Sequence, residues 1–220
     1  MRIISAQELE SWLTSGEVLE QDGRGVKVIR LSNEQIMKVF RPRRRLWVSR
    51  LAPQAIRFKH NSIRLSNLNI PTPLVNECFW LDKSQAVSGC SYKPLPGHSL
   101  EHIYRNSRNE FEALLPSFAA FINTLHQRGI YFRSLHLGNV LQLPNGGFGL
   151  IDFLDIHFKQ APLAHRLVVR NLEHLRGYLQ RNQMTDFPWE KLKSAYIQAT
   201  QIRGHKEALD ANRNTPKRDR

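Results

Sequence analysis

The spacing of apolar residues changes near the middle of the chain, from a strand pattern to a helix pattern. Residues 26–31 (VKVIRL) and 35–40 (QIMKVF) are short apolar runs separated by Ser-Asn-Glu, a pattern typical of strand, tight turn and strand. Residues 73–81 and 85–95, on either side of the turn-prone Asp82-Lys83-Ser84, predict two further strands. The first part of the chain is therefore expected to form an antiparallel sheet.

Two helices are predicted beside these strands. Residues 5–13 have the pattern of a short amphipathic helix. A second helix is predicted over 54–69, where Ile56, Ile63 and Leu65 have helical spacing and the following Ile-Pro-Thr-Pro prevents continuation. We expect this second helix to lie against the sheet.

Helices dominate after Pro96-Gly97, where the composition changes. The predicted helices are residues 99–105, 109–129, 165–181 and 188–202. In the longest of them, Pro116 is expected to produce a kink. The expected buried face of that helix consists of Leu114, Phe118, Phe121 and Leu125.

Short strand segments return within residues 131–153, around a Pro-Asn-Gly-Gly turn. The pattern as a whole predicts an α+β chain in two lobes. The first, over residues 1–91, is small and β-rich with one helix against its sheet. The second, over 92–202, is larger and helical, and residues 203–220 are expected to be a basic, disordered tail.

The composition indicates a folded chain with an adequate core. Of 220 residues, 41% are hydrophobic and 23% charged, which excludes wholesale disorder and collagen-like structure. Cys78 and Cys90 are too few for a disulfide framework and lack zinc-ligand spacing, so a reducing compartment is expected. The first residues lack the apolar run of a signal peptide, and no stretch reaches the ~20 apolar residues of a membrane span. We expect a cytoplasmic protein, with peripheral membrane binding allowed.

Positive charge is in excess, with a formal net charge of +13. Much of it lies in the last 18 residues and in residues 41–50, where the basic residues are Arg41, Arg43, Arg44, Arg45 and Arg50. Such a surface could bind nucleic acid through counterion release, or an anionic membrane leaflet with Trp47 at the interface. A solvated basic face is the simpler alternative. Nucleic acid is an unlikely partner, because no aromatic-basic repeat or recognition-helix motif accompanies the charge.

The stretch most informative about function is 132–139 (FRSLHLGN), followed after a turn by 150–153 (LIDF). Lys38 lies on the candidate strand over residues 35–40, 13 residues after Gly25 of the Asp-Gly-Arg-Gly turn. Each feature alone is common, since strand lysines often face solvent and hairpins often contain glycine. Their order is informative, because a loop and an adjacent strand end can supply an amide and a carboxylate, oxygen ligands that suit Mg²⁺.

This order of motifs resembles the catalytic and metal-binding loops of the protein-kinase-like fold. Sugar, antibiotic and lipopolysaccharide kinases of that fold carry an HxDLHxGN-type loop and then an Asp-Phe element, which together hold Mg²⁺ against ATP. The resemblance implies that Asn139 and Asp152 are the two metal ligands and that Lys38 pairs with the phosphates. It also implies that backbone amides around Gly23 and Gly25 cover the phosphates.

Among families of this fold, the chain resembles the lipopolysaccharide kinases of the Kdo/WaaP type, which phosphorylate sugars of the lipopolysaccharide inner core. The shared features are the lysine strand followed by a basic segment, NIPTP, KPLPGHSL, LHLGNVL and LIDF, over roughly residues 18–180. The resemblance implies ATP and Mg²⁺ as cofactors and an anionic glycolipid as substrate. It is also compatible with peripheral association at the inner face of the inner membrane.

Three positions depart from the pattern of these kinases. Ser134 replaces the loop Asp that accepts the proton of the acceptor hydroxyl, and Phe132 replaces the usual His. Asn61 stands where a helix Glu normally pairs with the lysine. A general base contributes about 10² to 10⁴ in rate, so its loss weakens catalysis without abolishing it.

Other residues could act in place of the missing Asp. His136 or Asp155 could be the base or a second metal ligand, although a loop histidine bonded to backbone and a turn carboxylate are the simpler interpretations. Ser134 could hydrogen-bond an acceptor hydroxyl or water. Three hypotheses stay open: an atypical inner-core sugar kinase, a pseudokinase that serves as a partner in envelope assembly, and a nucleic-acid-associated protein.

Overall fold

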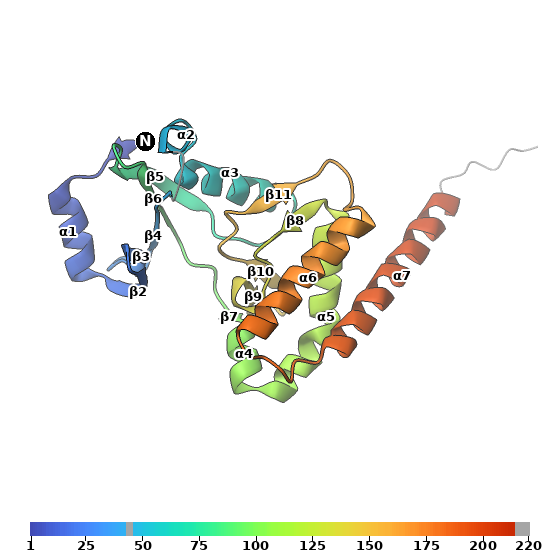
Figure 1. The fold of residues 1–220 in the computed structure, drawn as a ribbon. Coiled ribbons are helices and arrows are strands. Elements are labelled where there is room, and N and C mark those ends of the chain that lie inside the picture. Colours follow the sequence, from blue (N-terminus) through green and yellow to red (C-terminus); the bar gives the residue numbers. More distant parts are fainter. Residues whose placement is uncertain (43–45, 214–220) are drawn as a thin grey trace, which may run out of the picture. The chain divides into compact units, whose positions relative to one another are not determined.

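The computed structural model describes the backbone of residues 1–42 and 46–213 and the side chains of residues 1–42 and 46–202. It shows an α+β protein with a six-strand sheet near the N-terminus, followed by a largely helical region with small sheets (Figure 1). The chain divides into two compact units. The first unit comprises residues 1–97 and 141–155, and the second comprises 98–140 and the residues from 156 onward. The predicted two consecutive lobes differ from this division, because residues 141–155 group with the N-terminal part.

The first unit is built on a mixed sheet with the strand order β1-β5-β6-β4-β3-β2. Its strands are β1 (Arg2–Ile3), β2 (Glu17–Asp22), β3 (Gly25–Arg30), β4 (Ile36–Phe40), β5 (Val75–Asp82) and β6 (Val87–Tyr92). Neighbouring strands are antiparallel except for β1, which runs parallel to β5. The prediction of an antiparallel sheet was therefore incomplete, because the two-residue β1 is too short to show alternation.

Helices pack on both faces of this sheet. The described part of the first unit contains α1 (Ala6–Ser15), α2 (Leu46–Leu51) and α3 (Gln54–Asn67). α1 and α3 correspond to the helices predicted over residues 5–13 and 54–69, whereas α2 was not predicted, and one helix rather than two was expected against the sheet. Ser5 caps α1 by accepting a hydrogen bond from the Glu8 amide (3.1 Å). α1 then places Leu9 and Trp12 on a core that consists of Ile4, Ile29, Leu31, Met37, Val39 and Phe79.

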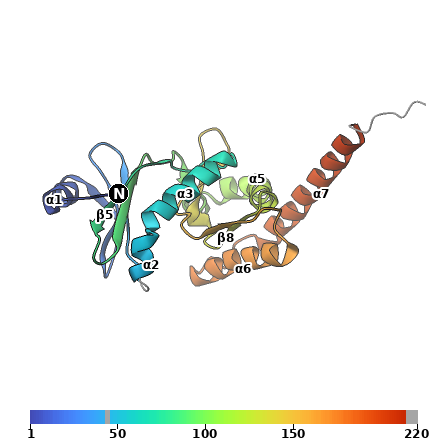
Figure 2. The ribbon, with the colours of Figure 1, turned by 90° about the horizontal axis from the view of Figure 1, so that it is seen from above.

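α3 lies on the opposite face, against β4, β5 and β6 (Figure 2). Side chains alternate along a strand, so Met37 and Val39 of β4 pack in the α1 core while Lys38 points to the α3 face. Phe58 of α3 is 1% exposed and contacts Phe40 at 5.4 Å between ring centroids. A lysine of β4 is thus held beside an apolar helix face.

A hairpin in residues 141–155 completes the first unit. Its strands β9 (Val140–Gln142) and β10 (Phe148–Leu150) are neighbours in a small sheet. Leu150 is fixed at both backbone groups, because its amide donates to Pro71 O (2.9 Å) and its carbonyl accepts from Thr72 Oγ1 (3.0 Å). This anchoring positions the Asp-Phe element that follows β10.

The second unit is largely helical. Its elements are β7 (His98–Ser99), α4 (Leu100–Asn106), α5 (Arg108–Gln127), β8 (Ile130–Phe132), the short 3₁₀ turn η1 (Leu137–Asn139), β11 (Ile156–Phe158), α6 (His165–Arg181) and α7 (Trp189–Arg213). α5 packs against α4 and α7, while β8 pairs antiparallel with β11 and contacts α6. These contacts enclose the core of this unit.

The buried face of α5 differs in part from the prediction. Phe118 and Leu125 are buried as expected, whereas Leu114 and Phe121 are only half-buried. The other large buried apolar residues of α5 are Phe111, Leu115 and Ile122. The face is rotated because α5 packs against helices on two sides. The helix continues through Pro116, which is exposed.

The C-terminal prediction is corrected in part. α7 continues to Arg213, so residues 203–213, expected to be disordered, have a helical backbone. Residues 214–220 and Arg43, Arg44 and Arg45 of the predicted basic segment lie outside the described residues. Within the described part of the chain, no helix is long and apolar enough to cross a bilayer.

Candidate functional site

The structure brings Lys38 and Asp152 together in the first unit. The Lys38 Nζ lies 2.7 Å from Asp152 Oδ1. The Lys38 side chain is only 12% exposed, because it runs beside Phe58 with Nζ 5.9 Å from the ring centroid, whereas the Asp152 side chain is 47% exposed. A half-exposed carboxylate next to a sheltered ammonium group can still bind a ligand from solvent.

The backbone at Asp152 is held in an unusual conformation. Its φ is +50°, in the left-handed region, which is unfavourable for residues other than glycine and least so for Asp and Asn. Phe153 follows and stacks on Phe58 of α3, with ring centroids 4.1 Å apart and planes 11° apart. Burial of Phe153 therefore helps to fix the turn that presents the Asp152 carboxylate.

Polar side chains of α3 hold the same turn by donating hydrogen bonds to its backbone carbonyl groups. Asn61 Nδ2 donates to Phe153 O (2.9 Å) and Leu154 O (3.3 Å). Arg57 donates to Leu154 O from Nε (3.0 Å) and Nη2 (2.6 Å). Asn61 replaces the glutamate expected to pair with Lys38, and here it binds backbone instead. Lys38 pairs with Asp152 itself.

The predicted phosphate-covering glycines lie on the β2–β3 hairpin. Gly25 has φ +105°, a conformation that L residues rarely adopt, and no heavy atom lies within 4 Å of where a Cβ on Gly23 would be. Asp22 Oδ1 accepts from the Arg24 amide (2.8 Å). This hydrogen bond is the largest cause that lowers the pKa of Asp22 below its usual range. The hairpin is open at its tip.

The second unit carries Ser134, His136 and Asn139 in one loop between β8 and β9. Asn139 is buried, and its Nδ2 donates to Ser134 O (3.0 Å) while its backbone amide donates to His136 O (2.9 Å). Because the amide nitrogen is committed to a carbonyl, Asn139 Oδ1 is the atom left to bind a cation. Ser134 and His136 are half-buried.

A carboxylate from α4 reaches this loop. The His136 ring stacks on Tyr178 of α6, with centroids 4.0 Å apart and planes 5° apart, and the Tyr178 hydroxyl donates to Glu101 Oε2. Arg105 binds the other oxygen of Glu101 at 2.8 Å. A Cβ on Gly138 would lie 3.0 Å from Glu101 Oε2, so glycine leaves room for the carboxylate.

These contacts shift the pKa values of both groups beside His136. Burial acts to raise the pKa of Glu101, but the Tyr178 hydroxyl and Arg105 outweigh it, so the pKa is lowered and the carboxylate is charged. Burial, followed by the bond to Glu101, raises the pKa of Tyr178. The tyrosine is therefore a stable donor and holds Glu101 in place.

Each unit offers one oxygen ligand of a kind that Mg²⁺ binds. Mg²⁺ usually binds one or two protein oxygens together with waters and phosphate oxygens. Asp152 supplies a carboxylate in the first unit, and Asn139 supplies an amide oxygen in the second. In the part of the chain that the structure describes, no group of three or more His, Cys, Asp or Glu side chains is arranged to hold a metal. Asp155 is half-buried, three residues after Asp152.

The sequence matches no protein-family model and no curated protein.

Several residues of the site were not found from the sequence. Arg57 and Phe58 lie on the face of α3 that carries Asn61. Arg57 and Asn61 are four residues apart, and this helical spacing of two polar residues was the available sign in the sequence. Glu101 and Tyr178 are 77 residues apart and had no local signal.

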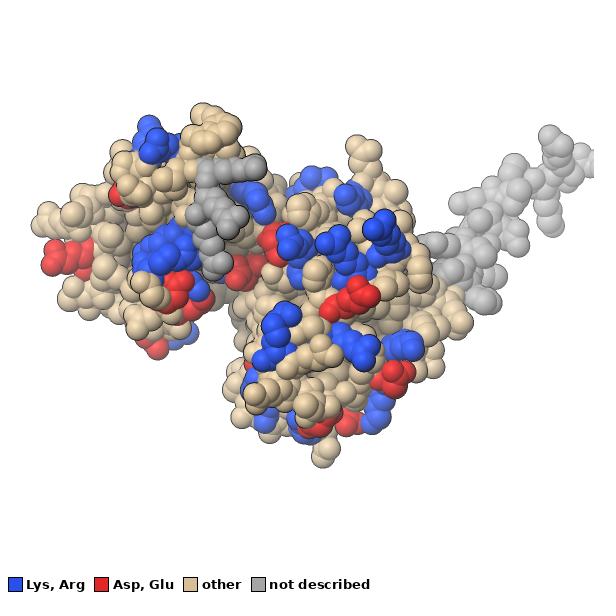
Figure 3. All heavy atoms as spheres, in the orientation of Figure 1, with Lys and Arg blue, Asp and Glu red and all other residues tan. Residues whose placement is uncertain are grey.

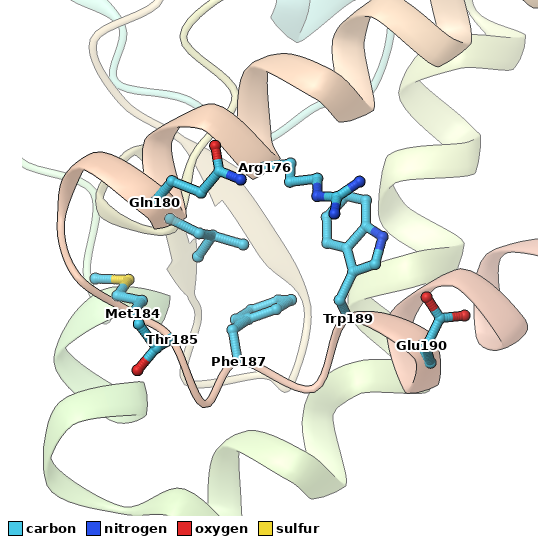
Figure 4. A pocket seen from close by; sticks show the side chains of 8 residues that line it. Arg176, Gln180, Met184, Thr185, Phe187, Trp189 and Glu190 are labelled. Carbon is cyan, nitrogen blue, oxygen red and sulfur yellow. The ribbon is translucent and has the colours of Figure 1, made fainter.

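The second unit also contains a cavity of about 420 Å³ that includes none of the predicted residues. Figure 4 shows Phe187 and Trp189 beside it, with Arg176 next to Trp189; the guanidinium carbon is 6.0 Å from the ring centroid. Met184 and Phe187 are buried in its wall. The cavity lies between α6 and the start of α7, and Arg176 and Glu190 stand at its rim.

Proposed function

We propose that this chain is an atypical kinase-like phosphotransferase that uses Mg-ATP and acts on a sugar of the lipopolysaccharide inner core. The observation that carries the proposal is the Lys38–Asp152 ion pair, 2.7 Å long, on a turn held by α3. A strand lysine and an aspartate after a buried strand are the two charged groups that phosphoryl transfer most requires for placing ATP. The resemblance of LHLGNVL and LIDF to lipopolysaccharide kinases supports the choice of acceptor.

Each residue has a role in this proposal. Lys38 binds the nucleotide phosphates, the open hairpin at Gly23 and Gly25 covers them, and Asp152 and Asn139 are the ligands of the metal. Mg²⁺, when bound, neutralises charge on the phosphate oxygens. The oxygen of the acceptor hydroxyl forms a bond to the γ-phosphorus while the bond to the β,γ-bridging oxygen breaks, and ADP leaves.

The hydroxyl proton of the acceptor needs a base, and Ser134 cannot take that role at neutral pH. His136 is the candidate base within the loop that also carries Ser134 and Asn139. Its ring stacks on Tyr178, which is held in turn by the charged Glu101. Asp155 is the alternative carboxylate. Ser134 binds the acceptor hydroxyl or a water.

Thermal unfolding with and without ATP and Mg²⁺ tests the nucleotide site. A ligand that binds the native state at 100 times its Kd adds about 2.7 kcal/mol to stability, so millimolar Mg-ATP is expected to raise the Tm of the wild type. Asp152→Ala is expected to remove the magnesium-dependent part, and Lys38→Met to weaken ATP binding with or without metal. Lys83→Met, in an exposed turn, is the matched control. A wild type whose Tm does not respond to millimolar ATP contradicts the proposal.

A pseudokinase that acts as a partner in envelope assembly is the second candidate, and Ser134 at the position of the base is the observation that favours it. Transfer of labelled γ-phosphate to inner-core acceptors separates the two. Ser134→Asp restores a carboxylate, so an active enzyme is expected to gain about 10²-fold or more in rate. Mg-ATP binding with no transfer in either protein identifies the pseudokinase.

The proposed cellular place is the cytoplasm, with peripheral association at the inner face of the inner membrane. α2 supports this, because Leu46, Trp47 and Leu51 on this short helix are 38%, 67% and 81% exposed. Arg50 lies in its last turn, and indole rings and basic side chains both favour an anionic interface. Trp47→Ser is expected to reduce co-sedimentation with anionic vesicles several-fold, and equal co-sedimentation contradicts this assignment.

A further inference from the structure

A small cavity in the first unit is lined by basic side chains. Its volume is about 190 Å³, and the residues that give it its character are Asp22, Arg24, Lys27, Arg41, Gln54 and Leu154. They come from the β2–β3 hairpin, the residue after β4, the first turn of α3 and the turn that follows Asp152. Figure 3 shows Lys and Arg side chains on the surface of each unit, with Asp and Glu side chains among them. The cavity is a site where three cations converge.

Asp22 gathers these cations without neutralising them. Its Oδ2 lies 3.4 Å from Lys27 Nζ and 3.6 Å from Arg24 Nη2. Lys27 also pairs with Glu20 of β2 at 2.8 Å, so two carboxylates face three cationic groups. The local charge stays positive, and an incoming anion meets Arg24, Lys27 and Arg41 together.

Arg41 is the most sheltered of the three cations. Its Nη1 donates to Val26 O (2.6 Å), which fixes the guanidinium beneath the hairpin. Burial lowers the pKa of Arg41, which means that the charged form has lost hydration. An anion in the cavity forms a charge-assisted hydrogen bond with the Arg41 guanidinium, whose planar shape suits ligands that present two oxygens.

The N-terminus of α3 adds partial positive charge to the same cavity. Gln54 is the first residue of this 14-residue helix, and Pro53 before it provides no side-chain cap. The first amides of a helix carry partial positive charge and favour anions. The backbone and the three side chains therefore favour the same kind of ligand.

The size of the cavity limits the ligand. Sites for complete small molecules occupy about 300 to 1,000 Å³, so this cavity suits one anionic group of a larger ligand. Its wall also includes Val39 and Phe40, the two residues that follow Lys38 on β4, and Leu154 lies two residues after Asp152. Both elements of the ion pair thus continue directly into the cavity wall.

We propose that this cavity binds a phosphate or carboxylate group of the acceptor saccharide, separately from the nucleotide phosphates. The assignment to an acceptor rests on the proposed function, whereas anion binding itself does not. An acidic sugar held here is fixed next to the elements that carry Lys38 and Asp152. The basic hairpin then selects acceptors by charge.

Calorimetric titration of the full chain with inorganic phosphate, glucose 6-phosphate and Mg-ATP tests the proposal, at constant ionic strength because salt screens exposed charges. The test protein is Arg24→Gln/Lys27→Gln, and the control is Arg30→Gln, which removes an exposed β3 arginine paired with Glu17. Phosphate and sugar phosphate are expected to bind the double variant at least tenfold more weakly, with less than a twofold change in the control. Mg-ATP is expected to lose less affinity than phosphate does, because the hairpin covers the nucleotide with backbone amides around Gly23 and Gly25, which both substitutions keep.

The other outcomes each decide against a part of the proposal. Unchanged phosphate affinity in a double variant with wild-type Tm overturns the cavity as an anion site. Equal weakening of Mg-ATP and phosphate assigns the cavity to the nucleotide and overturns the acceptor role. A wild type that binds phosphate but not ATP contradicts the kinase function while the cavity test still holds.

Discussion

The turn at Asp152 and the loop before Asn139 are held in opposite ways. In the first unit, α3 binds backbone carbonyls and leaves the Asp152 carboxylate half-exposed beside a lysine. In the second unit, the strand that leads into the loop is fixed by a buried, neutral hydrogen-bond network. The comparison shows that a charged side chain paired with a lysine can stay half-exposed when helix contacts fix its turn through the backbone.

The neutral network centres on His126 of α5 and Asn171 of α6, each 1% exposed. His126 Nδ1 is 2.8 Å from the Tyr196 hydroxyl of α7, and Nε2 is 3.1 Å from Asn171 Oδ1. Asn171 Nδ2 donates to Phe132 O (2.6 Å), at the end of β8. Three helices are thereby joined to the residue that begins the loop.

The largest effect is expected from Asn171→Ala. It removes a buried amide, leaves a nitrogen of His126 without its partner and opens a small cavity. Phe132 O loses the Asn171 donor but keeps the Leu135 amide (3.1 Å). An unsatisfied buried group costs about 1 to 3 kcal/mol and the cavity adds to this, so we expect the free energy of unfolding to fall by about 3 kcal/mol in urea denaturation.

Asn182→Ala is the matched control. Its side chain donates to Tyr178 O (2.9 Å) at an exposed position after α6, so the expected loss is below about 0.5 kcal/mol. Equal losses in the two variants mean that the buried network does not stabilise the second unit more than a surface contact does.

The pH dependence of stability gives the next effect. Burial lowers the pKa of His126 from 6.5 to about 4. The unfolded chain therefore binds the proton more readily, and the contribution of neutral His126 is complete above about pH 6.5 and is lost as pH falls toward 4. At 1.36 kcal/mol per pKa unit, we expect a loss of about 2 to 3 kcal/mol across this window.

His126→Gln tests this origin of the pH dependence. Glutamine keeps polar atoms near Tyr196 and Asn171 but does not titrate, so its unfolding free energy is expected to fall less steeply between pH 6.5 and 4 than that of the wild type. Parallel curves for the two proteins mean that His126 is not the origin of the loss in stability between pH 6.5 and 4.

The spacing of apolar residues predicted much of the fold, but few of the contacts that hold the Asp152 turn and the loop before Asn139. The structure has α6 over residues 165–181, as predicted, because its apolar stripe is regular. α2 was missed because six residues after a run of arginines give no usable period. Lys38 and Asp152 were predicted as site residues from motifs, whereas the places of Arg57, Glu101 and Tyr178 depend on contacts between distant segments. Contacts of this kind cannot be predicted from the spacing of residues that are close in sequence.

The smallest expected effect separates the backbone at Asp152 from its charge. Asp152→Ala and Asp152→Gly remove the same carboxylate and leave the same sheltered Lys38, so the difference between them reports the conformation of residue 152. A left-handed φ of +50° costs alanine about 1 to 2 kcal/mol and glycine nothing, while glycine loses about 0.5 to 1 kcal/mol through its freer unfolded chain. We expect the glycine variant to be more stable by up to about 1 kcal/mol in urea denaturation.

The same pair of substitutions at Glu110, an exposed residue in the first turn of α5, is expected to give the opposite sign, because glycine disfavours a helix by about 1 kcal/mol relative to alanine. Both Asp152 variants are expected to lose the magnesium-dependent response to ATP equally. If alanine is as favourable as glycine at 152, the left-handed turn is not maintained in solution, and α3 does not hold the backbone that presents the carboxylate. If glycine is better and both variants lose magnesium dependence, the fixed backbone and the half-exposed carboxylate are separate properties of one residue.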